Sequence, residues 1–275
     1  MAITVDPLSS PPNDAAESYE RFVLVYSPVW ILAVAVVQLG GLMTSWGNLT
    51  YLLFGIGLAL PLVLWPLIRG TPDQDRPWTE RYWVRFNLWI GLFTWSGSYF
   101  VTHIFFQSLG MKYRFPTDWT FEAVIGGAGS EKVPFFLYLM TQAYFATYHV
   151  VMARLLRAFR RWARPGPVGV ALAIAVIAYV VAFAETFAMA NPLLADYFEY
   201  TDRNFMLWVG SSGYAMLFIV SLPMFERIDR GERNSVGRSS LGRWTLGRTA
   251  LEAMAASWLA LQLIDLWAMF VVGVA

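Results

Sequence analysis

Four ionisable side chains lie inside stretches of this chain that are apolar and long enough to cross a bilayer: His103, His149, Glu185 and Asp265. A charged group in hydrocarbon costs several kcal/mol, so such residues are rare in membrane segments and usually face a protein interior or a cavity. Imidazole and carboxyl groups are also the ones that enzymes most often use to move protons. The pattern therefore predicts a membrane protein with a buried polar site.

Each of these residues also has a purely structural interpretation. His103 and His149 can be hydrogen-bonded to a neighbouring helix. Asp265 can be an ion-pair partner for Arg203 or a helix-packing group. Glu185 is harder to explain in this way, because an isolated carboxyl group in an apolar site is expected to be neutral and can then donate a proton. The two histidines stand alone and far apart in the sequence, so no metal site is expected.

The composition supports a membrane protein and excludes several other classes. Hydrophobic residues make up 57% of the 275 residues and charged residues only 14%, with a mean hydropathy of +0.48; soluble proteins average about a quarter charged residues. A net charge of +1 gives no attraction for nucleic acid. The chain has no cysteine, which excludes disulfides, thiolate nucleophiles and thiolate-bound metals.

Runs of about twenty apolar residues predict an all-α, polytopic membrane helix bundle with about seven transmembrane helices. The seven predicted spans are Phe22–Thr44, Leu49–Ile68, Phe86–Phe106, Pro134–Leu155, Pro167–Ala190, Phe205–Phe225 and Thr249–Val274. Residues 1–20 are polar and contain Ser-Ser-Pro-Pro-Asn-Asp, which favours a disordered tail. Residues 21–275 are predicted to form a single transmembrane domain.

The distribution of basic residues predicts the orientation of a multi-pass integral membrane protein, because cytoplasmic loops retain Arg and Lys. In a seven-span arrangement sixteen basic residues fall on one side: Arg21, Arg69, Arg76, Arg81, Arg85, Arg154, Arg157, Arg160, Arg161, Arg164, Arg227, Arg230, Arg233, Arg238, Arg243 and Arg248. The other side receives four: Lys112, Arg114, Lys132 and Arg203. The N-terminus is therefore predicted in the cytoplasm and the C-terminus outside it.

The rise of about 1.5 Å per helical residue gives the depth of each ionisable group. His103, Glu185 and Asp265 lie on the extracytoplasmic side of the predicted mid-membrane plane, and His149 lies on the cytoplasmic side. The loops nearest the first three are Gln107–Val133 and Asn191–Asn204. We expect a polar pocket that opens toward this outer half.

Several sequence segments resemble one known family, in the same order and from about Phe22 to the C-terminus. They are Trp78–Trp89, which contains Arg-Tyr-Trp-Val, Gly97–Phe106, Tyr113–Pro116, Thr147–Val150, Ala184–Thr186, Thr201–Arg203, Ser221–Asp229, which contains Pro-Met-Phe-Glu-Arg-Ile-Asp, and Asp265–Trp267. The chain closely resembles the cycloeucalenol cycloisomerase family of cyclopropyl sterol isomerases. The mostly arginine basic set suits a bacterial member, in the inner membrane; a eukaryotic member would lie in the endoplasmic reticulum.

The resemblance implies an intramolecular isomerase that needs no cofactor. The 9,19-cyclopropane ring of a sterol such as cycloeucalenol would open to the 8(9)-alkene of obtusifoliol. A proton must reach the methylene carbon that becomes the C19 methyl group, positive charge develops near C9, and a proton leaves C8. The sterol would reach the site sideways from the lipid.

The residues offer groups for each of these tasks. Glu185 is the predicted proton donor and His103 its partner, and the reverse assignment is equally compatible with the sequence; His149 and Asp265 complete the catalytic candidates. Aromatic faces could stabilise the cation. The substrate-binding candidates are Tyr82, Trp83, Asn87, Trp89, Tyr99, Thr102, Tyr148, Thr186, Asp202, Arg203 and Trp267. For Asp202, Arg203 and Asn87 the alternative is loop anchoring, since Asp202 precedes a predicted helix and can cap it.

Three other classes share some of these features. A sterol or lipid carrier would use the same cavity without acid–base chemistry. A proton-coupled transporter would also bury Glu, His and Asp, but it predicts internal repeats, and none is evident. A retinal-type receptor needs a lysine within the bundle, whereas Lys112 and Lys132 both fall in an outer loop.

Overall fold

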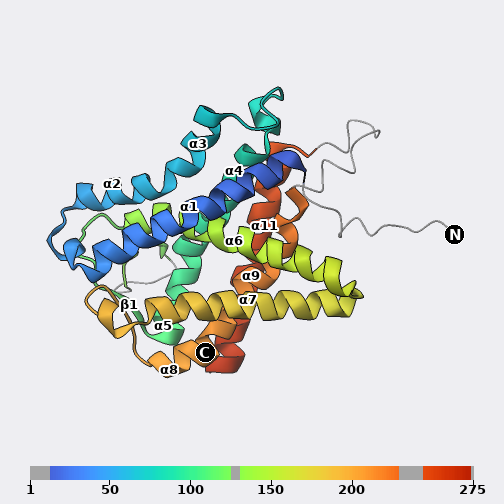
Figure 1. Cartoon of the computed structure of the whole chain (residues 1–275). Coiled ribbons are helices and arrows are strands. Elements are labelled where there is room, and N and C mark those ends of the chain that lie inside the picture. Colours follow the sequence, from blue (N-terminus) through green and yellow to red (C-terminus); the bar gives the residue numbers. More distant parts are fainter. Residues whose placement is uncertain (1–12, 125–130, 229–243, 274–275) are drawn as a thin grey trace.

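The computed structural model describes residues 13–124, 131–228 and 244–273, and within these ranges the chain is almost entirely helical (Figure 1). The α-helices are α1 (Asp14–Leu39), α2 (Asn48–Ala59), α3 (Pro61–Arg69), α4 (Tyr82–Ser96), α5 (Thr102–Leu109), α6 (Phe135–Ala163), α7 (Pro167–Met189), α8 (Arg203–Phe205), α9 (Ser211–Phe225) and α11 (Leu246–Trp267). Two short strands, β1 (Met111–Tyr113) and β2 (Phe198–Tyr200), complete the fold. The all-α prediction is confirmed apart from these two strands.

Among the described residues, four helical segments are long and apolar enough to span a membrane: Asp14–Leu39, Pro167–Met189, Arg203–Phe225 and Leu246–Val272. The pair α2 and α3, bent by 43°, makes a fifth if it counts as one span. The predicted number of seven is not confirmed. The other two predicted spans, Phe86–Phe106 and Pro134–Leu155, are helical but carry many polar groups.

The central position of α6 explains this polarity. Helix α6 packs against α1, α2, α4, α7 and α9, and α4 packs against α1, α3, α6 and α11. In Figure 1, α6 lies between α1 and α7. Because their neighbours are helices and not lipid, α4 and α6 can bury polar side chains such as Gln142 and His149 that find partners within the bundle.

The first helix begins earlier than the sequence pattern indicated. Asn13 caps α1, its side-chain oxygen accepting a hydrogen bond from the Ala16 amide at 2.8 Å. Residues 14–20, assigned above to a disordered tail, therefore belong to α1, and Tyr19 and Glu20 are buried. Packing of these side chains against the bundle stabilises the added turns. Residues 1–12 lie outside the described part of the chain.

Within the described ranges, π-helical turns occur at three places: Gly97–Val101, Met206–Gly210 and, at the end of α11, Ala268–Val272. A π turn inserts an extra residue and rotates the side chains that follow it, and such turns are frequent at functional sites. The first turn joins α4 to α5 and the second joins α8 to α9. Close packing continues beyond the second turn: a Cβ on Gly213 would lie 2.5 Å from the Trp267 ring, so α9 and α11 approach through this glycine.

The loop after α5 and the loop after α7 meet across one end of the bundle, where they form a two-stranded sheet. Strands β1 and β2 are antiparallel, with Met111 opposite Tyr200 and Tyr113 opposite Phe198. Gly110, at φ +58, turns the chain into β1, and a Cβ there would lie 2.2 Å from the Thr201 hydroxyl oxygen. Only glycine fits this turn without strain. The two-stranded sheet brings the loops after α5 and α7 together.

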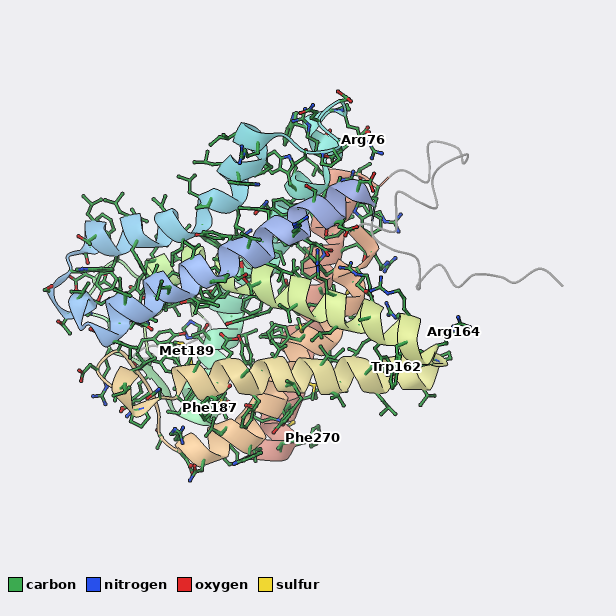
Figure 2. All side chains as sticks on the ribbon, in the orientation of Figure 1. Arg76, Trp162, Arg164, Phe187, Met189 and Phe270 are labelled. Carbon is green, nitrogen blue, oxygen red and sulfur yellow. The ribbon has the colours of Figure 1, made fainter. Side chains whose placement is uncertain are left out.

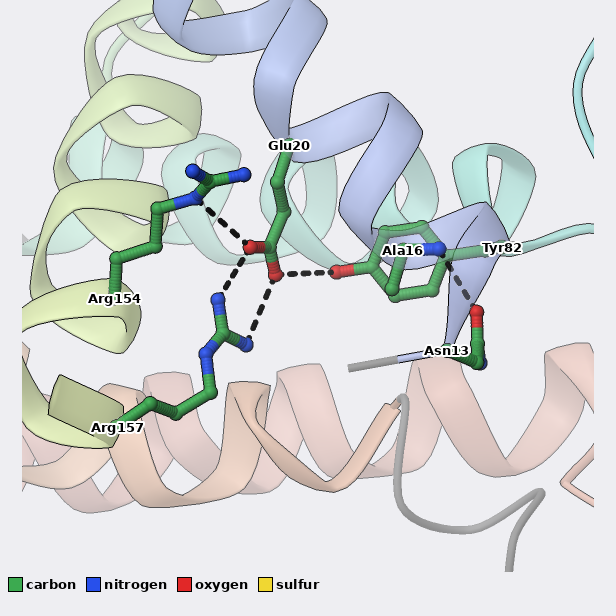
Figure 3. Close-up of polar contacts among 6 residues, drawn as sticks. All are labelled: Asn13, Ala16, Glu20, Tyr82, Arg154 and Arg157. Atoms are coloured by element: carbon green, nitrogen blue, oxygen red, sulfur yellow. Dashed lines mark hydrogen bonds and ion pairs between the residues drawn. The ribbon is translucent and has the colours of Figure 1, made fainter. Parts of the chain in front are cut away.

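Ion pairs gather at the opposite end of the bundle. Glu20 on α1 accepts hydrogen bonds from Arg157 and Arg154 on α6 and from the Tyr82 hydroxyl (Figure 3). Arg160, which is also on α6, forms an ion pair with buried Glu226 at 2.7 Å. Figure 2 places Trp162 and Arg164 at this end of α6 and Met189 toward the other end of the molecule.

Candidate active site

A cavity of about 130 Å³ lies beneath the two-stranded sheet, between the helices of the bundle. The first π turn contributes Gly97, Ser98 and Val101 to its wall, and the two-stranded sheet contributes Met111, Tyr113 and Tyr200. Its remaining polar lining is Gln38, Thr94, Thr102, Thr141, Tyr144, Glu185, Thr186 and Tyr214. The cavity therefore combines a mostly apolar wall with a small set of hydroxyl groups and one carboxyl group.

Glu185 projects from α7 to this cavity and is held by two phenols. The Tyr214 hydroxyl on α9 donates a hydrogen bond to Glu185 Oε2. The Tyr148 hydroxyl on α6 lies near the same carboxyl group and interacts with it. No arginine or lysine forms an ion pair with Glu185 in the described part of the chain. A carboxyl group held by neutral donors, rather than by a cation, can accept or release a proton without breaking an ion pair.

A second, larger space adjoins the first. A groove of about 470 Å³ runs between α1 and α7 over α6, with Trp30, Val34 and Val181 among its mostly apolar walls. Four residues line both the groove and the inner cavity: Gln38, Tyr144, Glu185 and Met189. Glu185 thus stands in the partition between a membrane-facing groove and the interior.

Five tyrosines surround the carboxyl group of Glu185 closely enough to interact with it electrostatically: Tyr113, Tyr144, Tyr148, Tyr200 and Tyr214. Burial raises the pKa of Tyr113 and of Tyr200, the two that belong to the two-stranded sheet, above the usual value for a phenol. Both phenols therefore stay neutral at physiological pH. Tyr113 also interacts with Thr102, and this contact links β1 to α5.

The structure places His103 beside the cavity wall and not on it. Val101, Thr102 and Phe105 line the inner cavity, whereas the buried His103 ring turns toward the loop, where its Nε2 accepts a hydrogen bond from the Ala123 amide at 3.2 Å. Its Nδ1 has no hydrogen-bond partner among the described residues. His103 and Glu185 therefore line no common space, and a direct proton exchange between them is not supported by this arrangement.

His149 is fully enclosed in the bundle. Its Nδ1 donates to the Phe145 carbonyl at 2.8 Å, and its Nε2 lies 2.9 Å from the Ser221 hydroxyl. Aromatic rings of Trp89, Phe93 and Phe225 pack around the imidazole. Both ring nitrogens are satisfied and neither cavity is lined by this residue, so the geometry matches the structural alternative weighed from the sequence.

Asp265 lies on an exposed face of α11 and makes no ion pair within the described ranges. Its suggested partner, Arg203, donates instead to the Ala190 carbonyl at 2.6 Å. Asp202 caps the helix that follows it by accepting from the Phe205 amide at 2.9 Å. The anchoring interpretation of Asp202 and Arg203 agrees with these contacts.

The other candidates separate into two groups. Thr102, Tyr148 and Thr186 line one of the two spaces next to Glu185. Away from both spaces lie Tyr82, Trp83, Asn87, Trp89, Tyr99 and Trp267. Asn87, for example, donates to the Tyr19 hydroxyl at 2.7 Å and accepts from Gln142 at 3.1 Å, which joins α4 to α1 and α6.

Five residues of the site were missing from the sequence prediction: Gln38, Tyr113, Tyr144, Tyr200 and Tyr214. A sequence signal existed for Tyr113 and Tyr200. Their segments, Met111-Lys112-Tyr113 and Phe198-Glu199-Tyr200, both alternate apolar and charged residues as half-buried strands do. Gln38, a buried amide near the end of an otherwise apolar run, was a second signal. Tyr144 and Tyr214 had none, because tyrosine is common in bundle cores.

The fold and the site together define a class: a multi-helix membrane protein with a carboxyl group between a mostly apolar groove and an inner cavity. Over 266 residues the chain is 35% identical to cycloeucalenol cycloisomerase of Arabidopsis thaliana, and the alignment covers 94% of this chain and 88% of that protein. The chain therefore belongs to the cycloeucalenol cycloisomerase family and is an intramolecular isomerase. No family model matches the sequence, and no solved structure matches it.

Proposed function

We propose that the protein opens the 9,19-cyclopropane ring of a sterol of the cycloeucalenol type to give the 8(9)-alkene. The observation that carries the proposal is the Glu185 carboxyl group, held by Tyr148 and Tyr214 in the partition between groove and cavity. The named activity of the Arabidopsis relative supports the same reaction. The sterol would come from the surrounding lipid, and the reaction needs no cofactor.

The sizes of the two spaces suggest how the substrate lies. Ligand pockets usually occupy about 300–1,000 Å³, a range that includes the groove at about 470 Å³ but not the inner cavity at about 130 Å³. The rigid rings of the sterol would therefore occupy the groove between α1 and α7. One edge would press against Glu185, and the inner cavity would take a small part of the molecule or water.

The chemistry requires one proton to be delivered and one to be removed. Neutral Glu185 would donate its proton to the cyclopropane methylene, the C9–C19 bond would break, and the C8 proton would leave to form the alkene. No atom is gained or lost overall. The hydrogen bond from Tyr214, together with the nearby Tyr148 hydroxyl, would stabilise the carboxylate formed in the first step.

The second proton transfer has two candidate acceptors. Glu185 itself, once ionised, could take the C8 proton and be ready for the next turnover. His103 could act instead, if its ring rotates from Ala123 toward the cavity lined by its neighbour Thr102. His149 and Asp265 line neither space, so we assign them no proton-transfer step.

Two polar side chains could orient the sterol hydroxyl. Gln38 is buried, lines both spaces and makes no side-chain hydrogen bond within the described residues. Thr186 is 2% exposed and lines the inner cavity, and its hydroxyl likewise has no partner in that part of the chain. An unsatisfied buried polar group costs free energy, so a substrate hydroxyl that completes these bonds would be favoured.

The direct test is to incubate the purified full chain with a 9,19-cyclopropyl sterol and to identify the product. We expect an alkene of unchanged mass from the wild type. Glu185→Gln should lower kcat by about a thousandfold, within the range attributed to general acid–base groups, while sterol binding is retained. Recovery of bound but unchanged sterol from the wild type would contradict the proposal and favour a carrier.

We also propose that the arginine-rich end of the bundle faces the cytoplasm, with the N-terminus on that side. The start of α1 and the Arg154–Arg164 end of α6 lie toward the same end of the molecule, as does Arg76 (Figure 2). Because the chain has no cysteine, single cysteines introduced at Arg164 and at Asp118 can be labelled with an impermeant thiol reagent. Labelling of the Arg164 site from outside intact cells would contradict this orientation.

A further inference from the structure

A groove of about 450 Å³ between the beginning of α1 and the second half of α6 combines basic and apolar walls. Its basic side consists of Arg154, Arg157 and Arg161, and its apolar side includes Leu24, Val151 and Leu155. It belongs to neither space described above, although it touches the larger groove at Val151. The established isomerase activity does not require an arginine-lined site at this end of the bundle.

The arginines differ in how far they are already engaged. Arg157 is 9% exposed and directs two nitrogens at Glu20 (Figure 3). Arg154 uses only its Nε atom for Glu20, at 3.4 Å, and its side chain is 37% exposed. Arg161 is exposed and makes no ion pair within the described ranges. Glu20 thus fixes two guanidinium groups, while Arg154 and Arg161 keep donors free for a ligand.

The charge of the groove favours an anion. Three arginines face Glu17, which lines the groove, and Glu20, which lies beneath it. Three positive and two negative charges leave one positive charge, held at the end of α6 where Arg161 is open to solvent. Arginine donors suit the planar oxygen array of a phosphate group.

The apolar side indicates that the anion carries a hydrocarbon chain. Leu24 and Leu155 continue the lipid-facing surface of the bundle, where Val25 is 68% and Leu155 50% exposed. Trp162, 84% exposed and about two turns beyond Leu155 on α6, is a residue type that settles at the level of lipid headgroups. Free phosphate would leave the apolar wall uncovered. A choline headgroup would bring its cation next to the arginines.

We propose that this groove binds an anionic phospholipid, with the phosphate on Arg154 and Arg161 and one acyl chain along Leu24, Val151 and Leu155. Basic pockets between membrane helices at the cytoplasmic surface hold anionic headgroups by the same physics. The lipid in this groove would also form one edge of the substrate groove, because Val151 lines both.

The test is to titrate the detergent-purified full chain with phosphatidylglycerol and to count retained lipids by native mass spectrometry. Phosphatidylcholine with the same acyl chains and inorganic phosphate are the comparison ligands. We expect phosphatidylglycerol to bind at least fivefold more tightly than phosphatidylcholine, and inorganic phosphate to compete only at much higher concentration. Equal retention of the two lipids, or competition by inorganic phosphate at the lipid's own concentration, would overturn the proposal.

Three variants locate the site. Arg161→Gln should weaken phosphatidylglycerol binding about fivefold, the effect of one basic residue at a charged membrane surface. Glu17→Gln removes an opposing charge from the same groove and should strengthen binding by a similar factor. Arg164→Gln is the matched control, because Arg164 follows α6 but does not line the groove. The three substituted side chains are exposed, and circular dichroism melting curves check that each variant folds. An equal loss in the Arg161 and Arg164 variants would show attraction to diffuse surface charge and overturn the site.

Discussion

Near each end of this bundle a glutamate is held by hydrogen bonds, and the partners of the two glutamates differ in kind. Near the start of α1, Glu20 is 1% exposed and is surrounded by Arg154, Arg157 and the Tyr82 hydroxyl. Beneath the two-stranded sheet, half-buried Glu185 accepts a hydrogen bond from the Tyr214 hydroxyl, lies near the Tyr148 hydroxyl and pairs with no cation among the described residues. Cations fix a carboxylate in its charged form, whereas neutral phenols can hold either form. The comparison indicates that charged partners mark a structural glutamate, whereas neutral partners hold the carboxyl group that we propose as the proton donor.

The largest effect that sharpens the comparison is on stability. Glu20→Gln leaves buried Arg157 without its counter-ion and should lower the free energy of unfolding by about 3 kcal/mol or more. Glu185→Gln, which leaves no cation unpaired, should change the free energy of unfolding by less than about 1 kcal/mol. Denaturant titration in detergent micelles measures both. An equal loss in the two variants would remove the distinction.

The next effect is on catalysis. Tyr214→Phe removes one hydrogen bond to the Glu185 carboxyl group, and such a bond to a charged group is worth about 1.5–3 kcal/mol. We expect kcat to fall at least about tenfold. Tyr179→Phe is the matched control on α7, because its hydroxyl donates to the Trp208 carbonyl on an exposed face. Equal kcat values in the two variants would show that the phenol does not support the reaction.

A smaller change is expected where the substrate, and not the proton, is held. Gln38→Leu should raise KM about fivefold, the effect of losing roughly one hydrogen bond, and should leave kcat near the wild-type value. Steady-state kinetics with the cyclopropyl sterol separate the two constants. A fall in kcat with unchanged KM would instead place Gln38 in the chemical step.

The smallest effect should come from Asp265, a carboxyl group on the outer face of α11. Asp265→Asn should alter kcat and KM by less than about twofold, because this residue lines neither cavity. The same steady-state assay applies. A loss comparable to that of Glu185→Gln would mean that a position between the two spaces is not what makes a carboxyl group functional here.

Much of this organisation follows from the sequence, because apolar runs and isolated charges have strong physical consequences. All seven predicted segments are helical, and Glu185 stood out as a carboxyl group in an apolar run. The start of α1 was predictable too: Asn13 precedes Asp14 and Glu17, a recognised helix-capping pattern. It was missed because the preceding Ser-Ser-Pro-Pro segment favoured a tail.

The partners of these groups were not predictable from local pattern. Tyr214 lies 29 positions from Glu185, and the hydrogen bond between them exists only because α7 packs on α9. The depth of His103 was similar to that of Glu185, but depth along a helix does not fix the direction of a side chain around it. The π turn at Gly97–Val101 alters that direction just before His103. Pairings of this kind depend on tertiary structure.

The central claim is that Glu185 delivers the proton that opens the ring. The most direct measurement is to run the reaction in deuterated water and to locate the label in the sterol product by NMR. The account predicts one deuterium in the C19 methyl group with the wild type, and about a thousandfold slower appearance of labelled product with Glu185→Gln. Labelled product formed by the Glu185→Gln variant at the wild-type rate, or a ring-opened product without deuterium at C19, would contradict it.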